Sequence, residues 1–386
     1  MNVASFRQQM PVARRWAYFD HAAVAPLPQP ARVAVEQWAA EAAEEGDTRW
    51  PQWVARLEQV RHRAAELVGA HPDEIAFVSN TTSGINLIAE AFPWKNGDNV
   101  VVPANEFPSN IYPWMNLERR GVKARLVPVH RSQSLIPQLE AACDRHTRLV
   151  ALSWVSYADG WRVDLDELAE FAKRRGIELL LDAIQGLGLL PIDLGHYPID
   201  YLVADGHKWM LGPEGAGILY IRRERLDQLQ PLNVGWHSVV HAHDFSRIDP
   251  AWRPDAARYE GGSPNMAGCL ALGASLDLLA SFGLSKDQSP LADYVLELLE
   301  ELARRIRHVG GQVVSTWAPQ NRSGILAFRL PQVDLAFARR SFLAQGVVLS
   351  ARNGALRISP HAYCDQEDVN RFTDALERLC TAPAAS

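Results

Sequence analysis

Short apolar runs alternate with longer helical patterns through the first two-thirds of the chain. This alternation is typical of β-α-β units, in which parallel strands form one sheet and helices cover its faces. It therefore predicts an α/β fold with a mostly parallel sheet. The predicted strands are residues 74–78, 99–102, 123–127, 147–153, 178–182, 201–204 and 217–220.

The segment 165–175 shows how a covering helix is recognised. Asp164 precedes it as a possible cap, apolar residues recur at helical spacing, cations gather near its end, and Gly176 follows. These signals predict a helix that begins after Asp164 and stops at Gly176.

The pattern changes beyond about Asn265. Long helical stretches at 267–282 and 291–309 are followed by a few short strands and a closing helix at 366–379. The sequence thus predicts a large domain at 16–265 and a smaller α+β domain built from 1–15 and 266–386. A chain of 386 residues is long enough for this division.

Composition and charge exclude several classes of protein. The chain has 47% hydrophobic and 22% charged residues and a formal net charge of −6, so it has no global basic surface for nucleic acid or an anionic membrane. No run approaches the ~20 apolar residues of a membrane span, and the polar N-terminus lacks the apolar core of a signal peptide. Four scattered cysteines predict reduced thiols, and we expect a cytoplasmic protein.

Two neighbouring predicted strands end in an acid. The run 177–181 leads into Asp182, and the run 201–204 leads into Asp205. In open α/β sheets ligands bind outside the carboxyl ends of the strands, so both carboxylates are expected beside a ligand. A helix N-cap is the alternative role for Asp182.

Lys208 follows the second of these strands, within Gly206-His207-Lys208. A lysine in a semi-apolar pocket has a lowered amine pKa, which favours imine formation with an aldehyde. A solvated lysine is the ordinary alternative, and Asp182, nearby aromatic residues and the glycine-rich turn 211–217 favour the nucleophile.

The stretch 78–86, Val-Ser-Asn-Thr-Thr-Ser-Gly-Ile-Asn, passes from a strand into a helix through hydroxyl-bearing residues. Helix N-termini offer free N–H groups and the positive end of the helix dipole, so this turn suits a phosphate. A simple Ser/Thr cap explains the same pattern.

Together these motifs carry a family resemblance, with Asp182-Ala183-Ile184-Gln185, Gly206-His207-Lys208 and the stretch 259–265 (Tyr-Glu-Gly-Gly-Ser-Pro-Asn) as its most specific pieces. The chain resembles the class V aminotransferase family of fold-type I pyridoxal phosphate (PLP) enzymes. This family includes cysteine desulfurases, selenocysteine lyases, kynureninases and isopenicillin N epimerase. The match runs from the stretch 18–23 to the stretch 356–360.

The resemblance implies a role for each matching residue in holding the cofactor. Lys208 would hold PLP through an imine, and Asp182 would pair with the pyridine nitrogen so that the ring acts as an electron sink. The remaining cofactor contacts implied are a hydrogen bond from Gln185 to the phenolic oxygen and phosphate contacts from His207, Thr81 and Thr82.

The resemblance also implies a homodimer with shared active sites and an amino-acid substrate. Ser263 would reach the phosphate bound by the partner subunit, and Arg357 would grip the substrate α-carboxylate, a task suited to a planar two-pronged donor. Lys208 would then take the α-proton, and transamination, epimerisation or loss of a β-substituent would follow.

Two departures disfavour persulfide chemistry. Phe107 stands where desulfurases place a histidine over the cofactor, and it can stack but cannot transfer a proton. The stretch 350–357, where desulfurases carry a nucleophilic cysteine, has no thiol, and Cys364 lies beyond it as a predicted structural residue.

Two further positions differ from desulfurases. Tyr157 stands where they have an asparagine near the cofactor. In having Phe107 and Tyr157 at these two positions, the chain resembles the kynureninase and epimerase branch of the family. Asp205 occupies the place of a phosphate-binding Ser or Thr. A carboxylate beside a phosphate is repelled, so Asp205 must turn away, be neutralised by a neighbour, or be protonated.

Alternatives of other classes remain at this stage. We interpret His241-Ala242-His243-Asp244 as a polar loop and not as a metal site, because its spacing is not that of a helical ligand pair. A cysteine desulfurase or selenocysteine lyase and a non-catalytic scaffold of the same fold are the competing functions. A nicotinamide dehydrogenase lacks support, because no G-x-G-x-x-G opens the first β-α-β unit.

Overall fold

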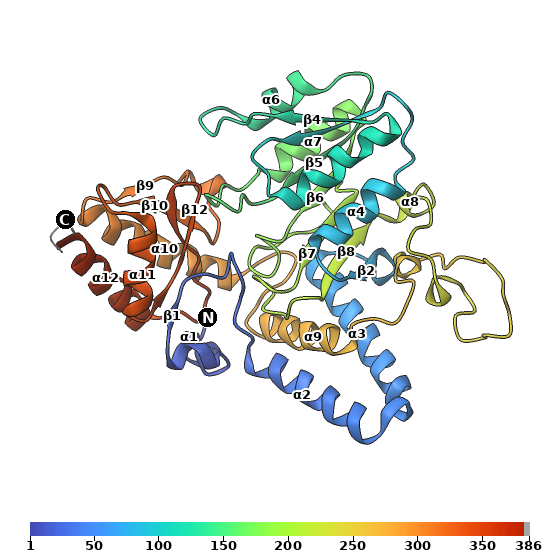
Figure 1. Ribbon diagram of the computed structural model, residues 1–386, viewed down its shortest axis with the longest axis horizontal. Helices are drawn as coiled ribbons and strands as arrows, with labels where there is room; N and C mark the ends of the chain where they lie inside the picture. The colour runs from blue at the N-terminus through green and yellow to red at the C-terminus, as the bar shows by residue number, and fades with distance from the viewer. Residues whose placement is uncertain (382–386) are drawn as a thin grey trace.

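A seven-stranded sheet forms the centre of the computed structural model, which describes residues 1–381 (Figure 1). Its strand order is β2-β8-β7-β6-β5-β3-β4, and every neighbouring pair is parallel except the two made by β8. The predicted α/β architecture is therefore confirmed. The strands are β2 (Ile75–Val78), β3 (Asn99–Pro103), β4 (Lys123–Val127), β5 (Thr147–Ser153), β6 (Glu178–Asp182), β7 (Tyr201–Asp205) and β8 (Gly217–Ile221).

Both faces of this sheet are covered by helices, because its central strands are apolar on both sides. Along β6, Leu180 packs in one core cluster, whereas Leu179 and Leu181 pack in the other. The helices of this part are α2 (Gln29–Glu44), α3 (Trp50–Val68), α4 (Thr81–Ala91), α5 (Tyr112–Met115), α6 (Leu135–Ala142), α7 (Leu165–Arg175), α8 (Arg223–Leu226) and α9 (Met266–Ser281).

Helix α7 has the ends that the sequence predicts. The Asp164 side chain accepts hydrogen bonds from the backbone N–H groups of Asp166 and Glu167, and Gly176 ends the helix at a φ of 61°. Of the helices in residues 1–381, none has the length and apolar character of a membrane span.

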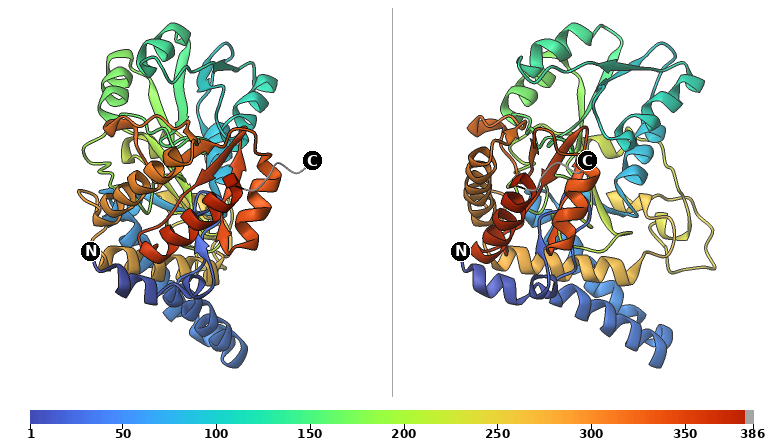
Figure 2. Two further views of the ribbon diagram at one scale, coloured as in Figure 1. Left: turned by 90° about the vertical axis from the view of Figure 1, so that its left-hand side faces the viewer. Right: turned by 60° about the vertical axis from the view of Figure 1, so that its left-hand side comes forward.

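A second, four-stranded sheet lies beside the first part of the molecule (Figures 1 and 2). Its order is β12-β13-β10-β9, and its strands are β9 (Gln312–Val313), β10 (Leu326–Arg329), β12 (Ser350–Arg352) and β13 (Ala355–Ile358). The helices of this part are α1 (Val3–Gln8), α10 (Pro290–His308), α11 (Leu335–Ala344) and α12 (Gln366–Thr381).

The N-terminal segment is tied to this smaller part. Strand β1 (Ala17–Tyr18) pairs in parallel with β11 (Val347–Val348), and Asp20 forms a bridge with Ser359. The predicted boundary near residue 265 falls at the start of α9, which packs against α2 and α3 (Figure 1).

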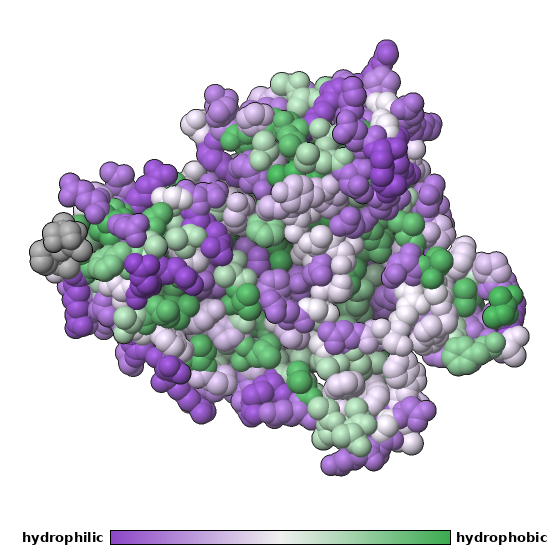
Figure 3. Space-filling model, viewed as in Figure 1, coloured by the Kyte–Doolittle hydropathy of each residue, from purple (hydrophilic) through white to green (hydrophobic). Residues whose placement is uncertain are grey.

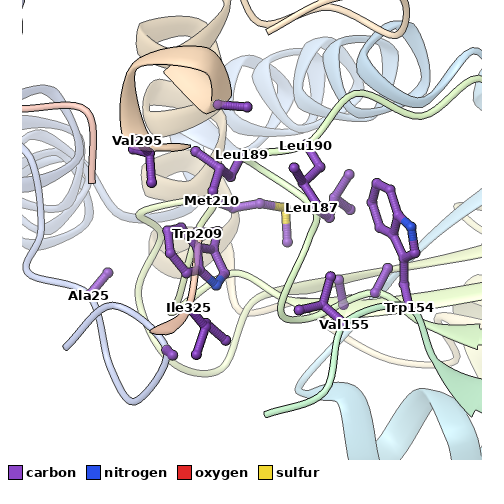
Figure 4. Close-up of a cluster of buried hydrophobic side chains, with 14 of the residues drawn as sticks. Ala25, Trp154, Val155, Leu187, Leu189, Leu190, Trp209, Met210, Val295 and Ile325 are labelled. Carbon is purple, nitrogen blue, oxygen red and sulfur yellow. The ribbon is translucent and has the colours of Figure 1, made fainter. Parts of the chain in front are cut away.

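The loop after β7 is buried where the two parts meet. Trp209 and Met210 lie in a hydrophobic cluster that includes Val295 from α10 and Ile325 next to β10 (Figure 4). Because Trp209 and Met210 are almost fully buried, this packing fixes the backbone that carries Lys208.

Candidate active site

A cavity of about 360 Å³ opens where β6 and β7 end and α4 begins. It draws its walls from segments far apart in the chain, as expected for a ligand site at the carboxyl edge of a parallel sheet. It is lined by Ala22, Ala23, Val24, Asn80, Thr81, Thr82, Phe107, Ser109, Ser153, Tyr157, Asp182, Ile184, Gln185, Asp205, His207, Lys208, Arg352 and Arg357.

Asp182 and Lys208 both line this cavity, and their charges interact. Asp182 is 2% exposed, and its Oδ1 accepts a hydrogen bond of 3.1 Å from the backbone of Ile184. Burial raises the pKa of Asp182, and the nearby Glu106 raises it further. Burial lowers the pKa of Lys208, while Asp182 opposes part of that shift. The amine of Lys208 is thus suited to attack an aldehyde.

Glu106 is a second acid close to Asp182, and sequence reasoning missed it. Its carboxylate accepts hydrogen bonds from the Ser153 backbone at 2.8 Å, from the Ser153 hydroxyl and from Asn110 at 3.2 Å. Burial raises the pKa of Glu106. Since Ser153 is the strand partner of Asp182, the two acids are held close to one another. The only sequence signal was an acid shortly after β3.

The amide of Gln185 is held in one orientation by two hydrogen bonds. Its Nε2 donates to the carbonyl of Ala22 at 3.0 Å, and its Oε1 accepts from the indole Nε1 of Trp209 at 3.1 Å. One N–H of the amide is left for a ligand, which suits a phenolic oxygen.

The first turn of α4 supplies donors to the other end of the cavity. Asn80 caps the helix by accepting from the backbone N–H of Ser83 at 2.8 Å. The Thr81 hydroxyl accepts from the backbone N–H of Asp205 at 3.0 Å, so its own O–H remains free to donate. Thr82 donates to the hydroxyl of Ser109 at 2.7 Å. Free N–H groups and hydroxyls here fit a phosphate.

Asp205 lies beside the ring of His207. Its Oδ2 lies 2.9 Å from Nδ1 of His207, which is ion-pair distance, although the two groups are not aligned as a directional hydrogen bond. The other oxygen, Oδ1, is buried without a hydrogen-bond partner among residues 1–381. Of the possibilities left open by the sequence, turning away is disfavoured, because Asp205 lines the cavity next to His207.

Arg357 is held at the cavity by three contacts. Its Nε donates to the hydroxyl of Ser350 at 3.2 Å, one terminal nitrogen to the carbonyl of Tyr157 at 2.6 Å, and the other to Asp20 at 3.2 Å. Burial lowers the pKa of Arg357, and Asp20 offsets that shift. Each terminal nitrogen keeps a second N–H, which is what a carboxylate needs. Sequence reasoning missed Asp20 as a partner and Arg352 as a lining residue.

Phe107 and Tyr157 lie together at the open side of the cavity. Their rings meet edge to face with centroids 5.2 Å apart, and the Lys208 Nζ is 5.9 Å from the Phe107 centroid. Phe107 is 46% exposed, so its face is available to stack on a planar ligand.

Ser263 is the one predicted site residue that lies elsewhere. It lines a separate cavity of about 680 Å³, beside Ser79, Ser83 and Asn86. Its predicted contact with a phosphate in the partner subunit stays a prediction.

None of the residues that line the first cavity is a cysteine. Cys364 is fully buried, its Sγ donates to the carbonyl of Tyr18 at 3.5 Å, and burial raises the pKa of its thiol. Within the described chain, no group of three or more His, Cys, Asp or Glu side chains could hold a metal, so His241 and His243 form no such site.

The residues present fit PLP. The cavity combines a buried amine, a buried carboxylate, an amide with one free N–H, and a helix N-terminus with hydroxyls beside a histidine. These groups match the aldehyde, the pyridine nitrogen, the phenolic oxygen and the phosphate of the cofactor, respectively.

Comparison with known proteins identifies the family of the chain. A model of the family described as aminotransferase class-V matches residues 17–372. A probable cysteine desulfurase of Methanothermobacter thermautotrophicus is 30% identical and is aligned over 98% of this chain and 98% of its own. The solved complex of the cystine C-S lyase C-DES with cysteine persulfide is 25% identical and covers 97% of this chain and 99% of its own, with a TM-score of 0.88. A C-DES mutant with glycine covalently linked to the PLP cofactor has 24% identity and a TM-score of 0.90, covering 98% of this chain and 99% of its own.

Proposed function

The chain belongs to the class V aminotransferase family of PLP-dependent enzymes. From this premise we propose that it eliminates the β-substituent of a cysteine-like amino acid, and that no cysteine of the enzyme takes part in the reaction. The reaction class is then a C–S or other C–X lyase.

The observation that carries this proposal is the chemistry of the cavity wall. No cysteine lines it, and the buried thiol of Cys364 is engaged with a backbone carbonyl. A nucleophilic cysteine needs exposure and a lowered pKa, and burial raises the pKa of Cys364 instead. The sulfur would therefore be released as part of a product and would not be transferred to a cysteine of the protein. The cystine C-S lyase C-DES, which shares the fold, offers a parallel for this reaction.

Each residue then has a task in holding the substrate and moving a proton. PLP supplies an electron sink that stabilises negative charge at the substrate α-carbon. Lys208 would anchor the cofactor, and its Nζ would take the α-proton of the substrate. Arg357 offers its two free N–H groups to the α-carboxylate. Phe107 and Tyr157 exclude water from the reacting face.

Asp182 and Gln185 set the charge of the cofactor ring. Asp182 would pair with the pyridine nitrogen, and a cationic partner there favours its carboxylate form against the effect of burial. Gln185 presents its remaining N–H towards the phenolic oxygen, because its other groups are taken by Ala22 and Trp209.

A cysteine desulfurase is the second candidate, because relatives such as the Methanothermobacter protein bear that name. It would need a protein thiol to accept sulfur, and among the described residues only Cys380 is an exposed cysteine. Transamination and epimerisation use the same proton removal by Lys208 and are the broader alternatives within the family.

The products separate these candidates. We expect cystine or cysteine to yield pyruvate and ammonia in equal amounts, at rates unchanged in Cys364→Ala, with Cys380→Ala as the matched control. Cys380→Ala is therefore a second test and not only a control: alanine as the main product, with turnover lost in Cys364→Ala or Cys380→Ala at an unchanged melting temperature, would instead establish the desulfurase. An absence of both products with cysteine-like substrates would contradict the lyase.

We further propose that the enzyme is a homodimer in the cytoplasm with two shared active sites. The cavity beside Ser263 is also lined by Ser83 and Asn86 of α4. The loop between α8 and α9 projects from the body of the molecule (Figure 1), and hydrophobic residues gather on it (Figure 3). Phe245 and Ile248 in this loop are exposed. Exposed apolar side chains on one segment support a protein contact there. The four free cysteines support a reducing compartment.

A further inference from the structure

The pair formed by Asp205 and His207 lies in the part of the cavity that suits a phosphate. Both residues line the cavity with Thr81 and Thr82 at the start of α4. Asp205 is 4% exposed, and its backbone N–H is bound by the Thr81 hydroxyl at 3.0 Å. Its carboxylate therefore cannot turn into bulk water.

A buried carboxylate at this position poses a charge problem. A phosphate beside it brings a second anion, and two anions in a site of low dielectric repel each other. Oδ1 of Asp205 has no hydrogen-bond partner among the described residues, and Nδ1 of His207 lies 2.9 Å from Oδ2. The other charged groups that line the cavity are Lys208, Asp182, Arg352 and Arg357.

An imidazole can bridge two anions only in one form. A neutral ring has one N–H, so it donates to the carboxylate or to the phosphate but not to both. A doubly protonated ring donates through Nδ1 and Nε2 at once and carries the positive charge that both anions need. Nδ1 lies 2.9 Å from Oδ2 of Asp205, although the two groups are not aligned as a directional hydrogen bond in the structure, and Nε2 is the nitrogen left for the phosphate.

We propose that Asp205 is a positioning residue that holds His207 as a doubly protonated ring between itself and the cofactor phosphate. The carboxylate would then strengthen phosphate binding through His207, although its own charge repels a phosphate. The inference rests on the proposed PLP site and adds to it a cation that depends on the acid at Asp205.

The test compares PLP with pyridoxal, which lacks the phosphate but can form the same imine with Lys208. Both are titrated into the dialysed full-length chain, and dissociation constants are read from absorbance. We expect Asp205→Asn to weaken PLP binding by about tenfold or more and to leave pyridoxal binding unchanged. Simple repulsion predicts the opposite sign, namely tighter PLP binding in Asp205→Asn, and that result would overturn the proposal.

A second variant distinguishes loss of this interaction from general loss of structure. In a His207→Gln background the carboxylate has lost its cation, so adding Asp205→Asn should no longer weaken PLP binding and should tighten it. An equal effect of Asp205→Asn in both backgrounds would also overturn the proposal. If the unmodified chain binds neither PLP nor pyridoxal, the proposed function itself fails, and this outcome is distinct from the others.

Discussion

Among single residues, Lys208 and Asp182 line the cavity and make it reactive, and Glu106 acts on Asp182 from beside it. Each is removed from water, so burial disfavours the charged form of each one. A surrounding of this kind costs stability, and it is typical of sites that do chemistry.

The lowered pKa of Lys208 has a consequence that can be measured before any turnover. Imine formation needs the neutral amine, so the rate at which the dialysed chain captures PLP should rise with pH and level off well below pH ~10.4, the ordinary value for lysine. A lysine peptide serves as the reference in the same absorbance assay. A capture rate that climbs in parallel with that of the peptide would contradict the burial of Lys208.

Glu106→Gln should stabilise the cofactor-free chain more at pH 8 than at pH 5. The folded-state pKa of Glu106 is raised, so the folded chain holds its proton longer than the unfolded chain does, and stability falls as pH rises between the two pKa values. The neutral amide removes this loss. Urea unfolding at both pH values should show a difference on the order of 1 kcal/mol. An effect of equal size at both pH values would mean that Glu106 is not perturbed.

At the level of elements, the edge of the sheet that carries the site depends on a close backbone contact. The contact is between Gly188 and the loop that follows β7 and carries Lys208. Gly188 has a φ of 101°, and a Cβ there would lie 2.4 Å from the backbone of Trp209 and Met210. Trp209 directly follows Lys208 and also binds Gln185.

Gly188→Ala should therefore lower both the melting temperature and the affinity for PLP. Gly97→Ala is the matched control, because Gly97 has a φ of 92° and open space around its Cβ position. The control should lose only the free energy of unfolding that a Cβ costs at a positive φ, roughly 1 kcal/mol, and it should keep its PLP affinity. Equal losses of PLP affinity in the two variants would refute the role of this contact.

Local pattern was enough for much of the fold. The predicted strands 123–127, 147–153 and 178–182 coincide with β4, β5 and β6, and both ends of α7 agree. These elements can be predicted because apolar runs and helix caps are local in the sequence and do not depend on residues far away in the chain.

The site was only partly predictable for a physical reason. Strand-end acids and the lysine motif pointed to one edge, and the structure brings these residues together there. The pairing of Arg357 with Asp20 joins residues 337 positions apart, and no local pattern encodes it. The burial of Glu106 was equally hidden, because burial depends on the packing of β5 beside β6.

For the molecule as a whole, the proposed dimer completes the site. If Ser263 of the partner subunit contributes to the phosphate pocket, PLP affinity depends on assembly. Sedimentation should show a dimer, and dilution into the monomer range should weaken PLP binding. A monomer that binds PLP as tightly as the concentrated sample would contradict the shared site.

The proposed active site depends above all on a covalent link between Lys208 and PLP. Borohydride reduction of the PLP-loaded chain, followed by peptide mass spectrometry, locates that link directly. We predict a pyridoxyl phosphate adduct on the peptide that contains Lys208, and none in Lys208→Ala. An adduct on a different lysine, or none in the unmodified chain, would contradict the assignment of the site.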